Sequence, residues 1–312
     1  MASAATYRKF LRPFTLIPPG VGFLCWGLCA AGASPATALD AAAWLPLILG
    51  ALMAATLNVA SNSINQIYDL EIDRINKPDR ALPAGELPLA SAWTMALAAY
   101  AVVLVLAWII RPAHADAATQ ARHETFWVVL VGALATYVYS APPFRTKRFT
   151  LLSNLTIALP RGALLIVSGW SASKTVLAPE PWFIAAVFWL YILGAASTKD
   201  FADIEGDRRG GCQTLPVRLG VRPAARIIAP FLCLPFLALP LGVHWGILTG
   251  PGPALILLGL GLSGYGAYIA YLILRRPEEL ATESNHVSWK HMYLLMVAGQ
   301  IGFAALYLFG SR

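Results

Sequence analysis

Residues 45–73 read LPLILGALMAATLNVASNSINQIYDLEID and indicate what kind of fold the chain adopts. The first part, residues 45–68, is mostly apolar and has the roughly 20 residues that a helix needs to cross the hydrocarbon core of a membrane. Polar side chains then recur at the spacing of one helical face: Asn58, Asn62, Asn65, Asp69 and Asp73. Because amides and carboxylates are costly in contact with lipid, we expect this face to line a polar cavity inside a bundle of helices.

The rest of the chain has the composition of a membrane protein. Of its 312 residues, 58% are hydrophobic and only 12% are charged, whereas soluble domains carry about 25% charged residues. Apolar runs of spanning length occur at about 14–33, 45–68, 89–110, 125–141, 151–170, 181–200, 224–243, 253–274 and 290–309. In lipid only helices and closed barrels satisfy the backbone, and these runs lack the alternation of strands. We therefore predict an all-α integral membrane fold, one domain over residues 1–312 with nine transmembrane helices.

Basic residues are distributed unevenly between the two sides of this predicted bundle. With a cytoplasmic N-terminus, 18 of the 23 Lys and Arg residues fall on the cytoplasmic side and four on the other. Cytoplasmic loops collect Lys and Arg, so we predict that the N-terminus is cytoplasmic and the C-terminus lies on the opposite side. The net charge of +7 then reflects topology, and we expect no nucleic-acid partner. The expected location is a prokaryotic inner membrane, with the lipid bilayer as partner.

A second acidic motif, KDFADIEGD at residues 199–207, ends the sixth apolar run on the same cytoplasmic side. Its aspartates share one face if the helix continues through the motif: Asp200, Asp203 and Asp207. Gly206 is expected to loosen this turn. The two glutamates, Glu71 in the first motif and Glu205 in the second, fall off the aspartate faces.

Carboxylates and an amide in this pattern are suited to magnesium. Mg²⁺ prefers hard oxygen ligands, often one or two carboxylates together with phosphate oxygens and water. Two facing carboxylate clusters would hold Mg²⁺ ions that bridge a diphosphate, and a metal-bound diphosphate is a good leaving group. The alternative is a set of surface salt bridges with Arg74, Lys77, Arg208 and Arg209. Two such motifs, each ending a span on the same side, favour the metal site.

The motifs and their neighbours resemble those of the UbiA superfamily of membrane prenyltransferases. Residues 65–73 match its NxxxDxxxD motif, and Asp203 with Asp207 matches its DxxxD motif. RALPAG at 80–85 is similar to the R-x-L-P-S-G segment of that family, and YSAPPFRTKR at 139–148 is similar to its Tyr-Pro…Lys-Arg loop between spans four and five. The resemblance implies an enzyme that ionises a prenyl diphosphate and alkylates a hydrophobic or aromatic acceptor inside the bilayer.

The resemblance also implies roles for individual residues. The Mg²⁺-diphosphate would be bound by Asn65, Asp69, Asp73, Asp203 and Asp207, with Asp200 as the adjacent acid. The phosphate charge would be neutralised by Arg80, Lys147 and Arg148. Weaker candidates for this role, for which cytoplasmic charge is an equal explanation, are Lys199, Lys77, Arg145 and Arg208.

Other polar residues are candidates for the acceptor site or the cavity wall. Arg161 lies in mid-span in LPRGALL, where an arginine is costly unless it faces a cavity or a partner. Asn58 and Asn62 extend the polar stripe. Tyr68 and Tyr139 are candidates to stabilise the allylic cation with a ring face, but packing at the membrane interface is the default interpretation for either.

The identity of the acceptor is less clearly indicated. KDFADIEGD, the NKP that follows the first motif, and the RG at 161–162 resemble the homogentisate prenyltransferase branch. YSAPP and EGDRRGGCQTLPVRLG resemble the chlorophyll synthase branch. We expect an aromatic precursor of a quinone or tocopherol, with a chlorophyllide-type or other isoprenoid-lipid acceptor as the alternative.

Two classes of protein without enzymatic activity remain as alternatives. A transporter would also carry ionisable residues in a helical bundle, but transporters bind ions near the midplane, often at broken helices. Here the acids lie at the cytoplasmic ends of spans. A membrane scaffold with surface charges would not explain the polar stripe from Asn58 to Asp73.

Overall fold

The computed structural model describes residues 3–283 and 286–310, and within them the fold is helical, with one isolated bridge between Phe149 and Gln213. Eight segments in this part of the chain are long and apolar enough to cross a membrane. Six of them centre on α2 (Ile17–Gly32), α3 (Ala41–Tyr68), α5 (Leu89–Ile109), α10 (Pro179–Ser197), α15 (Gly252–Arg275) and α17 (Val287–Phe309). The prediction of an all-α membrane fold is confirmed.

Prolines divide the other two spans into consecutive pieces. One consists of α8 (Thr150–Ala158), the π turn η3 (Leu159–Leu164) and α9 (Leu165–Ser171). The other consists of α13 (Val221–Cys233), η5 (Leu234–Ala238) and α14 (Leu239–His244). Pro160 in η3 and Pro235 in η5 each lack the N–H that would continue the helical hydrogen bonds. The π turn carries Arg161, and such turns occur frequently at functional sites.

The fourth predicted span is α7 (Glu124–Ser140), which has only 17 residues. At 1.5 Å per residue it is about 25 Å long, somewhat short of a hydrocarbon core about 30 Å thick. It packs beside α3 and α5. A total of nine spans, like the orientation of the bundle in a membrane, therefore stays a prediction.

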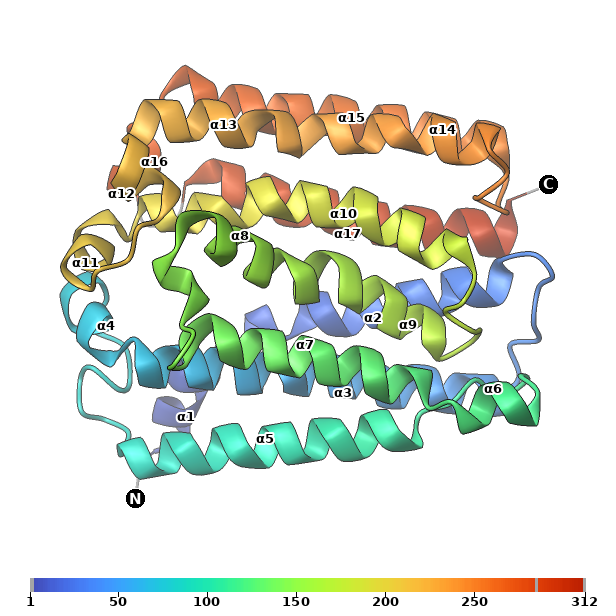
Figure 1. Ribbon diagram of the computed structural model, residues 1–312, viewed down its shortest axis with the longest axis horizontal. Helices are drawn as coiled ribbons and strands as arrows, with labels where there is room; N and C mark the ends of the chain where they lie inside the picture. Colours follow the sequence, from blue (N-terminus) through green and yellow to red (C-terminus); the bar gives the residue numbers. More distant parts are fainter. Residues whose placement is uncertain (1–2, 284–285, 311–312) are drawn as a thin grey trace.

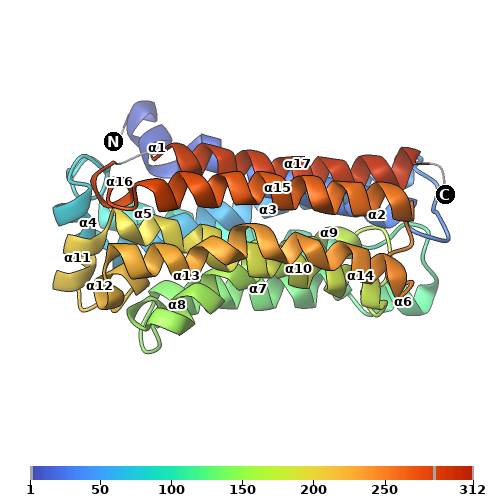
Figure 2. The same ribbon diagram turned by 90° about the horizontal axis from the view of Figure 1, so that it is seen from above.

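The long helices lie along the long axis of the molecule, and the short ones gather at its ends (Figures 1 and 2). One end carries α1 (Ala4–Leu11), α4 (Leu70–Asn76), α11 (Ile204–Arg209), α12 (Leu215–Leu219) and α16 (Glu279–Thr282). The opposite end carries α6 (Ala117–Ala121) and the end of α17. Both acidic motifs therefore lie at the same end of the bundle.

Aromatic packing stabilises the half of the bundle around α10. Phe188 packs edge-on against Trp26, Phe236 and Phe303, with ring centroids 5.1, 5.6 and 6.1 Å away. Such contacts join α2, α10, η5 and α17 in the largest buried cluster. The other half, around α3 and α7, has a smaller buried cluster and borders a cavity.

Candidate active site

Each acidic motif bends at an aspartate. Asp69 separates α3 from α4 and has φ −97° and ψ 8°. Asp203 lies between η4 (Thr198–Phe201) and α11 and has nearly the same backbone, φ −108° and ψ 8°. The helix therefore does not continue unbroken through either motif, in contrast to the expectation from spacing. The bends lie in the sparsely populated bridge region, where active-site residues are often found.

The two motifs pack directly against each other through α4 and α11. Asn76 at the end of α4 accepts a hydrogen bond from the backbone N–H of Gly206 (3.0 Å) and donates one to the carbonyl of Asp203 (3.3 Å). A Cβ at Gly206 would lie 2.4–2.6 Å from the Asn76 amide, and one at Gly210 would lie 2.7 Å from Ile72. Gly206 thus permits close packing of two helices. The expectation that it loosens the turn is wrong, because it lies inside α11.

Basic side chains contact three of the aspartates. Lys77 donates to both carboxylate oxygens of Asp203, at 2.5 and 2.6 Å, and so joins the two motifs. Arg80 contacts Asp73 at 2.6 Å. Lys147 pairs with Asp69, which also accepts a hydrogen bond from Asn65 at 2.8 Å. Positive and negative charges are therefore interleaved at this end of the bundle.

Burial shifts the pKa values of several of these groups. It raises the pKa of Asp73 above its usual range, although Arg80 opposes the shift. Burial, aided by the nearby negative charge of Asp203, raises the pKa of Asp207 to about 6. Desolvation lowers the pKa of Lys147 to about 8. Each shift reflects a charge that is held away from water without full compensation.

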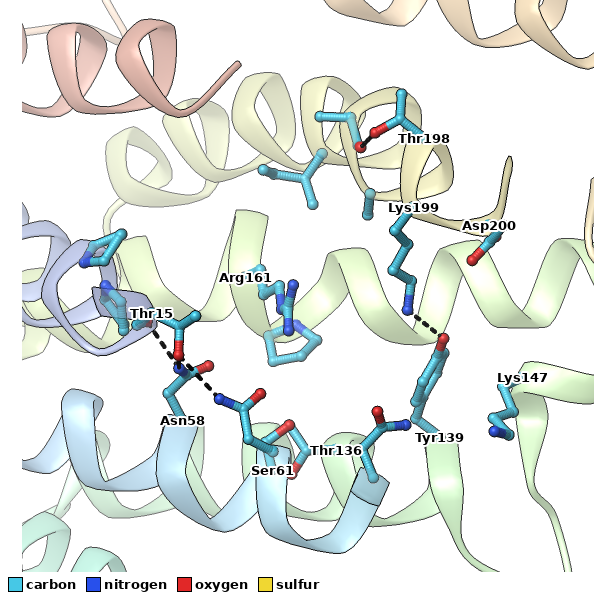
Figure 3. A pocket seen from close by; sticks show the side chains of 18 of the residues that line it. Thr15, Asn58, Ser61, Thr136, Tyr139, Lys147, Arg161, Thr198, Lys199 and Asp200 are labelled. Atoms are coloured by element: carbon cyan, nitrogen blue, oxygen red, sulfur yellow. Dashed lines mark hydrogen bonds between the residues drawn. The ribbon is translucent and has the colours of Figure 1, made fainter. Parts of the chain in front are cut away.

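A cavity of about 610 Å³ begins at these charged residues and runs between the helices. Most of the predicted site residues line it: Asn58, Asn62, Asn65, Asp69, Asp73, Arg80, Tyr139, Lys147, Arg161, Lys199, Asp200, Asp203 and Asp207. Figure 3 shows part of this cavity, where Lys199 points to Tyr139 and donates to its hydroxyl at 2.7 Å. The Lys199 ammonium also lies 4.8 Å from the centroid of that ring. The cavity therefore combines a charged end with walls supplied by several spans.

The middle of the cavity is polar on one side. Asn58 donates to the carbonyl of Thr15 (2.8 Å) and Asn62 to its hydroxyl (3.1 Å), which attaches η1 (Pro13–Thr15) to α3 (Figure 3). Arg161 and Arg12 also line the cavity. Within the described residues, neither guanidinium forms an ion pair with a carboxylate. Arg161 lies within a candidate membrane span, where a cation without an acidic partner is costly.

Two predicted site residues lie away from the cavity. Tyr68 packs edge-on against Trp93 and Tyr137, at 5.7 and 6.5 Å between centroids, and does not line the cavity. Arg148 is exposed at the end of η2 (Thr146–Arg148), where its carbonyl accepts from the N–H of Gln213. The sequence could not separate Arg148 from its neighbour Lys147, because side-chain direction in a short 3₁₀ turn depends on the contacts around it.

Three contributors to the site were missed or underrated from sequence. Asn76 and Thr15 have no signal in the sequence, because their partners lie far away along the chain. From the sequence, the general excess of positive charge on the cytoplasmic side explained Lys77 equally well. In the structure Lys77 contacts Asp203, which lies 126 residues further along the chain.

The candidate metal ligands at the charged end fit a hard cation. All are carboxylate or amide oxygens, and they come from both motifs. In residues 3–283 and 286–310, no three acidic, histidine or cysteine side chains already cluster closely enough to hold a metal on their own. Magnesium is usually bound by one or two carboxylates and completed by substrate phosphates, so this arrangement suits a metal that arrives with a phosphorylated ligand.

A comparison with protein families decides the class of this protein. Residues 21–297 match the model of the UbiA prenyltransferase family. The chain belongs to this family. As a UbiA-family protein it is an enzyme that transfers prenyl groups, which confirms the predicted class and sets aside the transporter and the scaffold.

Relatives of this UbiA-family chain act on different acceptors, as their names state. The digeranylgeranylglyceryl phosphate synthase of Methanoculleus marisnigri is 29% identical, over 81% of this chain and 83% of that protein. The bacteriochlorophyll synthase 33 kDa chain of Cereibacter sphaeroides is 31% identical, over 76% and 74%. The homogentisate phytyltransferase of Synechocystis is 29% identical, over 79% and 78%.

A solved structure has the same fold. The UbiA homolog from Archaeoglobus fulgidus, bound to GPP and Mg²⁺, superposes with a TM-score of 0.72 at 19% identity, over 97% of this chain and 99% of that one.

Proposed function

We propose that this UbiA-family chain transfers a prenyl group from a prenyl diphosphate to an aromatic precursor of a quinone or tocopherol, and that the reaction requires Mg²⁺. The observation that carries the proposal is the meeting of two acidic motifs at the charged end of one cavity between the helices, through Lys77–Asp203 and Asn76–Gly206. The Archaeoglobus homolog with GPP and Mg²⁺ supports it, because that protein has the same fold.

In this proposal the charged end binds the diphosphate. Its metal ligands are drawn from Asn65, Asp69, Asp73, Asp200, Asp203 and Asp207. When bound, Mg²⁺ would neutralise the diphosphate and so make it a better leaving group. Arg80, Lys147 and Lys199 line the same end and supply positive charge to the phosphate oxygens.

The ion pairs of the structure suggest how this end adapts to its ligand. Each of three basic side chains forms an ion pair with a carboxylate: Lys77, Arg80 and Lys147. A diphosphate offers these basic groups new oxygen partners, and the carboxylate oxygens that they leave become free for a metal. No charge is then left buried and unpaired, before binding or after it.

The reaction breaks one bond and forms another. The allylic C–O bond breaks, and its electron pair leaves with the diphosphate. A nucleophilic ring carbon of the acceptor then bonds to the allylic carbon, and the ring gives up a proton to the departing diphosphate. Apolar residues farther from the charged end, such as Leu57 and Ala54, would limit the access of water, which would otherwise capture the cation.

Arg161, together with Arg12, is proposed to hold the acceptor. Neither forms an ion pair with a carboxylate among the described residues, and both line the cavity. Homogentisate-type aromatic acids carry a carboxylate that such guanidinium groups bind well. The homogentisate phytyltransferase relative supports this acceptor class.

A chlorophyllide-type or glyceryl phosphate-type acceptor is the second candidate, because two further relatives bear those names. Products formed by the purified protein in lipid nanodiscs should be identified by mass spectrometry, with several prenyl diphosphates combined in turn with each acceptor class. We expect prenylated aromatic acids. A product formed only with chlorophyllide or with a glyceryl phosphate would replace the aromatic acceptor, and no product from any combination would contradict the proposed function.

A further inference from the structure

A second hollow lies on another face of α10, separate from the candidate active site. It is a groove of about 670 Å³ to which α10 contributes Leu193 and Ser197. Its walls are α8 and α13, which both pack against α10 and have it between them (Figure 1). The α10 residues Ile192, Ala195 and Ala196 line the active-site cavity instead. The two hollows therefore share α10 as a wall and use different sides of it.

The groove has the composition of a surface that faces lipid. Most of the residues that line it are apolar, and several of these are well exposed, such as Leu151 at 70% and Ile227 at 45%. Three candidate membrane spans form it: Thr150–Ser171, Pro179–Phe201 and Val221–His244. In a bilayer, an apolar groove between such spans is filled by lipid chains.

The length of the groove matches the thickness of one leaflet. Its lining begins at the end of α12, with Arg218 and Leu219, and reaches Phe231 on α13. From Val221, where α13 begins, to Phe231 the helix rises about 15 Å. This is half of a hydrocarbon core that is about 30 Å thick. One acyl chain of a phospholipid therefore fits along the groove.

A single cation lies at the outer end of the groove. Among the described residues that line it, Arg218 is the only charged one. Arg218 is exposed, and in residues 3–283 and 286–310 it forms no ion pair with a carboxylate. Two acids at the same end of the bundle have other partners, since Glu205 pairs with Arg209 at 2.7 Å and Glu278 with Arg222 at 2.5 Å. The groove thus offers positive charge without a competing acid where its lining leaves the spans.

An uncharged polar side chain lies further into the groove. Asn154 on α8 is half-buried and forms no hydrogen bond with another side chain or backbone group of the described residues. It lies within the span Thr150–Ser171, where an amide without a partner is costly. By contrast, the Ser197 hydroxyl donates to the Leu193 carbonyl at 2.7 Å. Asn154 is therefore suited to donate to an oxygen that a lipid brings with it.

We propose that this groove binds one anionic phospholipid. An acyl chain lies along Leu193 between α8 and α13, the phosphate accepts hydrogen bonds from Arg218, and an ester carbonyl accepts one from Asn154. A zwitterionic phospholipid has the same chains and esters, but it places a positive charge near Arg218 and binds more weakly. The site does not depend on prenyl transfer, because the groove is separate from the active-site cavity.

The test measures lipid binding to the purified full chain by native mass spectrometry. Phosphatidylglycerol and phosphatidylcholine with identical acyl chains are titrated separately into the protein in detergent. The first phosphatidylglycerol should bind at least about fivefold more tightly than the first phosphatidylcholine. Glycerol phosphate, which has the charge but no acyl chain, should not displace it.

Variants separate the roles of the two polar residues. Arg218→Gln should weaken phosphatidylglycerol about fivefold and phosphatidylcholine by less than about twofold, whereas Arg218→Lys keeps the charge and should bind like the natural chain. Arg275→Gln is the matched control, because it removes an exposed arginine at the same end of the bundle, outside the groove lining. Asn154→Leu should weaken both lipids by a common factor of about three.

A phosphatidylglycerol with a photoreactive group in its acyl chain locates the site. Crosslinked peptides should contain residues 150–155 or 227–231, and excess unlabelled phosphatidylglycerol should remove these crosslinks. The inference fails if the two lipids bind equally, if Arg218→Gln is no weaker than Arg275→Gln, or if crosslinks spread evenly over the bundle. A dimeric chain without crosslinks in these peptides would show that a second copy covers the groove, and it would overturn the inference as well.

Discussion

At the scale of single residues, the charged end of the cavity is organised by pairs. Asp73 contacts Arg80, Asp69 contacts Lys147, and Asp203 contacts Lys77. The sequence indicated the aspartates because they recur at helical spacing, and it indicated Arg80 and Lys147 through resemblance. It could not indicate which aspartate each base contacts, because the pairs join positions as far as 126 residues apart.

Removing one carboxylate from either motif should nearly abolish the reaction. We expect Asp69→Asn and Asp203→Asn each to lower kcat at least about 100-fold, because positioned metal charge supplies several kcal/mol. Thermal unfolding in detergent checks that both variants fold. Glu71→Gln and Glu205→Gln are matched controls, since those glutamates are 79% and 54% exposed and lie outside the cavity lining. Turnover near the natural value in both aspartate variants would contradict the assignment.

Lys147 and Arg148 are neighbours that should differ in function. Lys147 is buried and lines the cavity, whereas Arg148 is exposed and does not. We expect Lys147→Met to raise the KM for the prenyl diphosphate about tenfold or more, because a charge-assisted hydrogen bond contributes about 1.5–3 kcal/mol. Arg148→Met should change it by less than about threefold. Steady-state kinetics on both variants check this, and the reverse order would contradict it.

Arg161 should act on the acceptor alone. Arg161→Met is expected to raise the KM for the acceptor about tenfold or more, with the KM for the donor changed by less than about threefold. Arg226→Met, an exposed arginine on α13, serves as control. If Arg161→Met changes neither KM nor kcat, the role assigned to this residue is wrong.

At the scale of elements, the site depends on bends that spacing alone does not reveal. The periodic pattern correctly placed the polar face of α3, and Asn58, Asn62 and Asn65 line the cavity. It did not reveal that α3 ends at Tyr68 or that Asp203 interrupts the second motif. The short helices that follow these breaks, α4 and α11, pack against each other, and spacing within one motif cannot predict such a tertiary contact.

The contact between α4 and α11 gives a prediction about Gly206. In Gly206→Ala the new methyl group would displace the Asn76 amide, which lies 2.4–2.6 Å from its position. Loss of two hydrogen bonds should raise the KM for the prenyl diphosphate by roughly tenfold. Gly264→Ala on α15, where a methyl group meets open space, should have no effect.

A double mutant tests the mechanism of that effect. Asn76→Ala combined with Gly206→Ala should be no worse than Asn76→Ala alone, since both changes remove the same contact. Strictly additive losses would show that Gly206 acts in some other way.

At the scale of the whole molecule, the sequence was informative because lipid restricts the choice of structure. Apolar length located eight membrane-spanning segments that the structure also contains. The run at 224–243 is interrupted where Pro235 begins a 3₁₀ turn, a detail that hydropathy averages out. The cavity could not be predicted from the sequence either, because it depends on how distant segments pack, as Phe23 and Met53 do in one buried cluster.

The orientation of the bundle can be tested by labelling from one side. Glu205→Cys lies at the end with the acidic motifs and His114→Cys at the opposite end, and both positions are exposed. In intact cells an impermeant maleimide should label His114→Cys, and it should label Glu205→Cys only after permeabilisation, because basic loops stay cytoplasmic. The chain without added cysteines is the blank. The reverse pattern would contradict a cytoplasmic site.

The central claim is that residues of both motifs form a single site for Mg²⁺ and a diphosphate. It is tested most directly by the equilibrium binding of a non-reactive prenyl thiolodiphosphate, measured with Mg²⁺ and with EDTA. We expect EDTA to raise the Kd at least about 100-fold, and either Asp69→Asn or Asp203→Asn alone to remove most of the effect of Mg²⁺. Binding that is equally tight in EDTA, or a Mg²⁺ effect that survives in Asp203→Asn and is lost in Asp69→Asn, would contradict it.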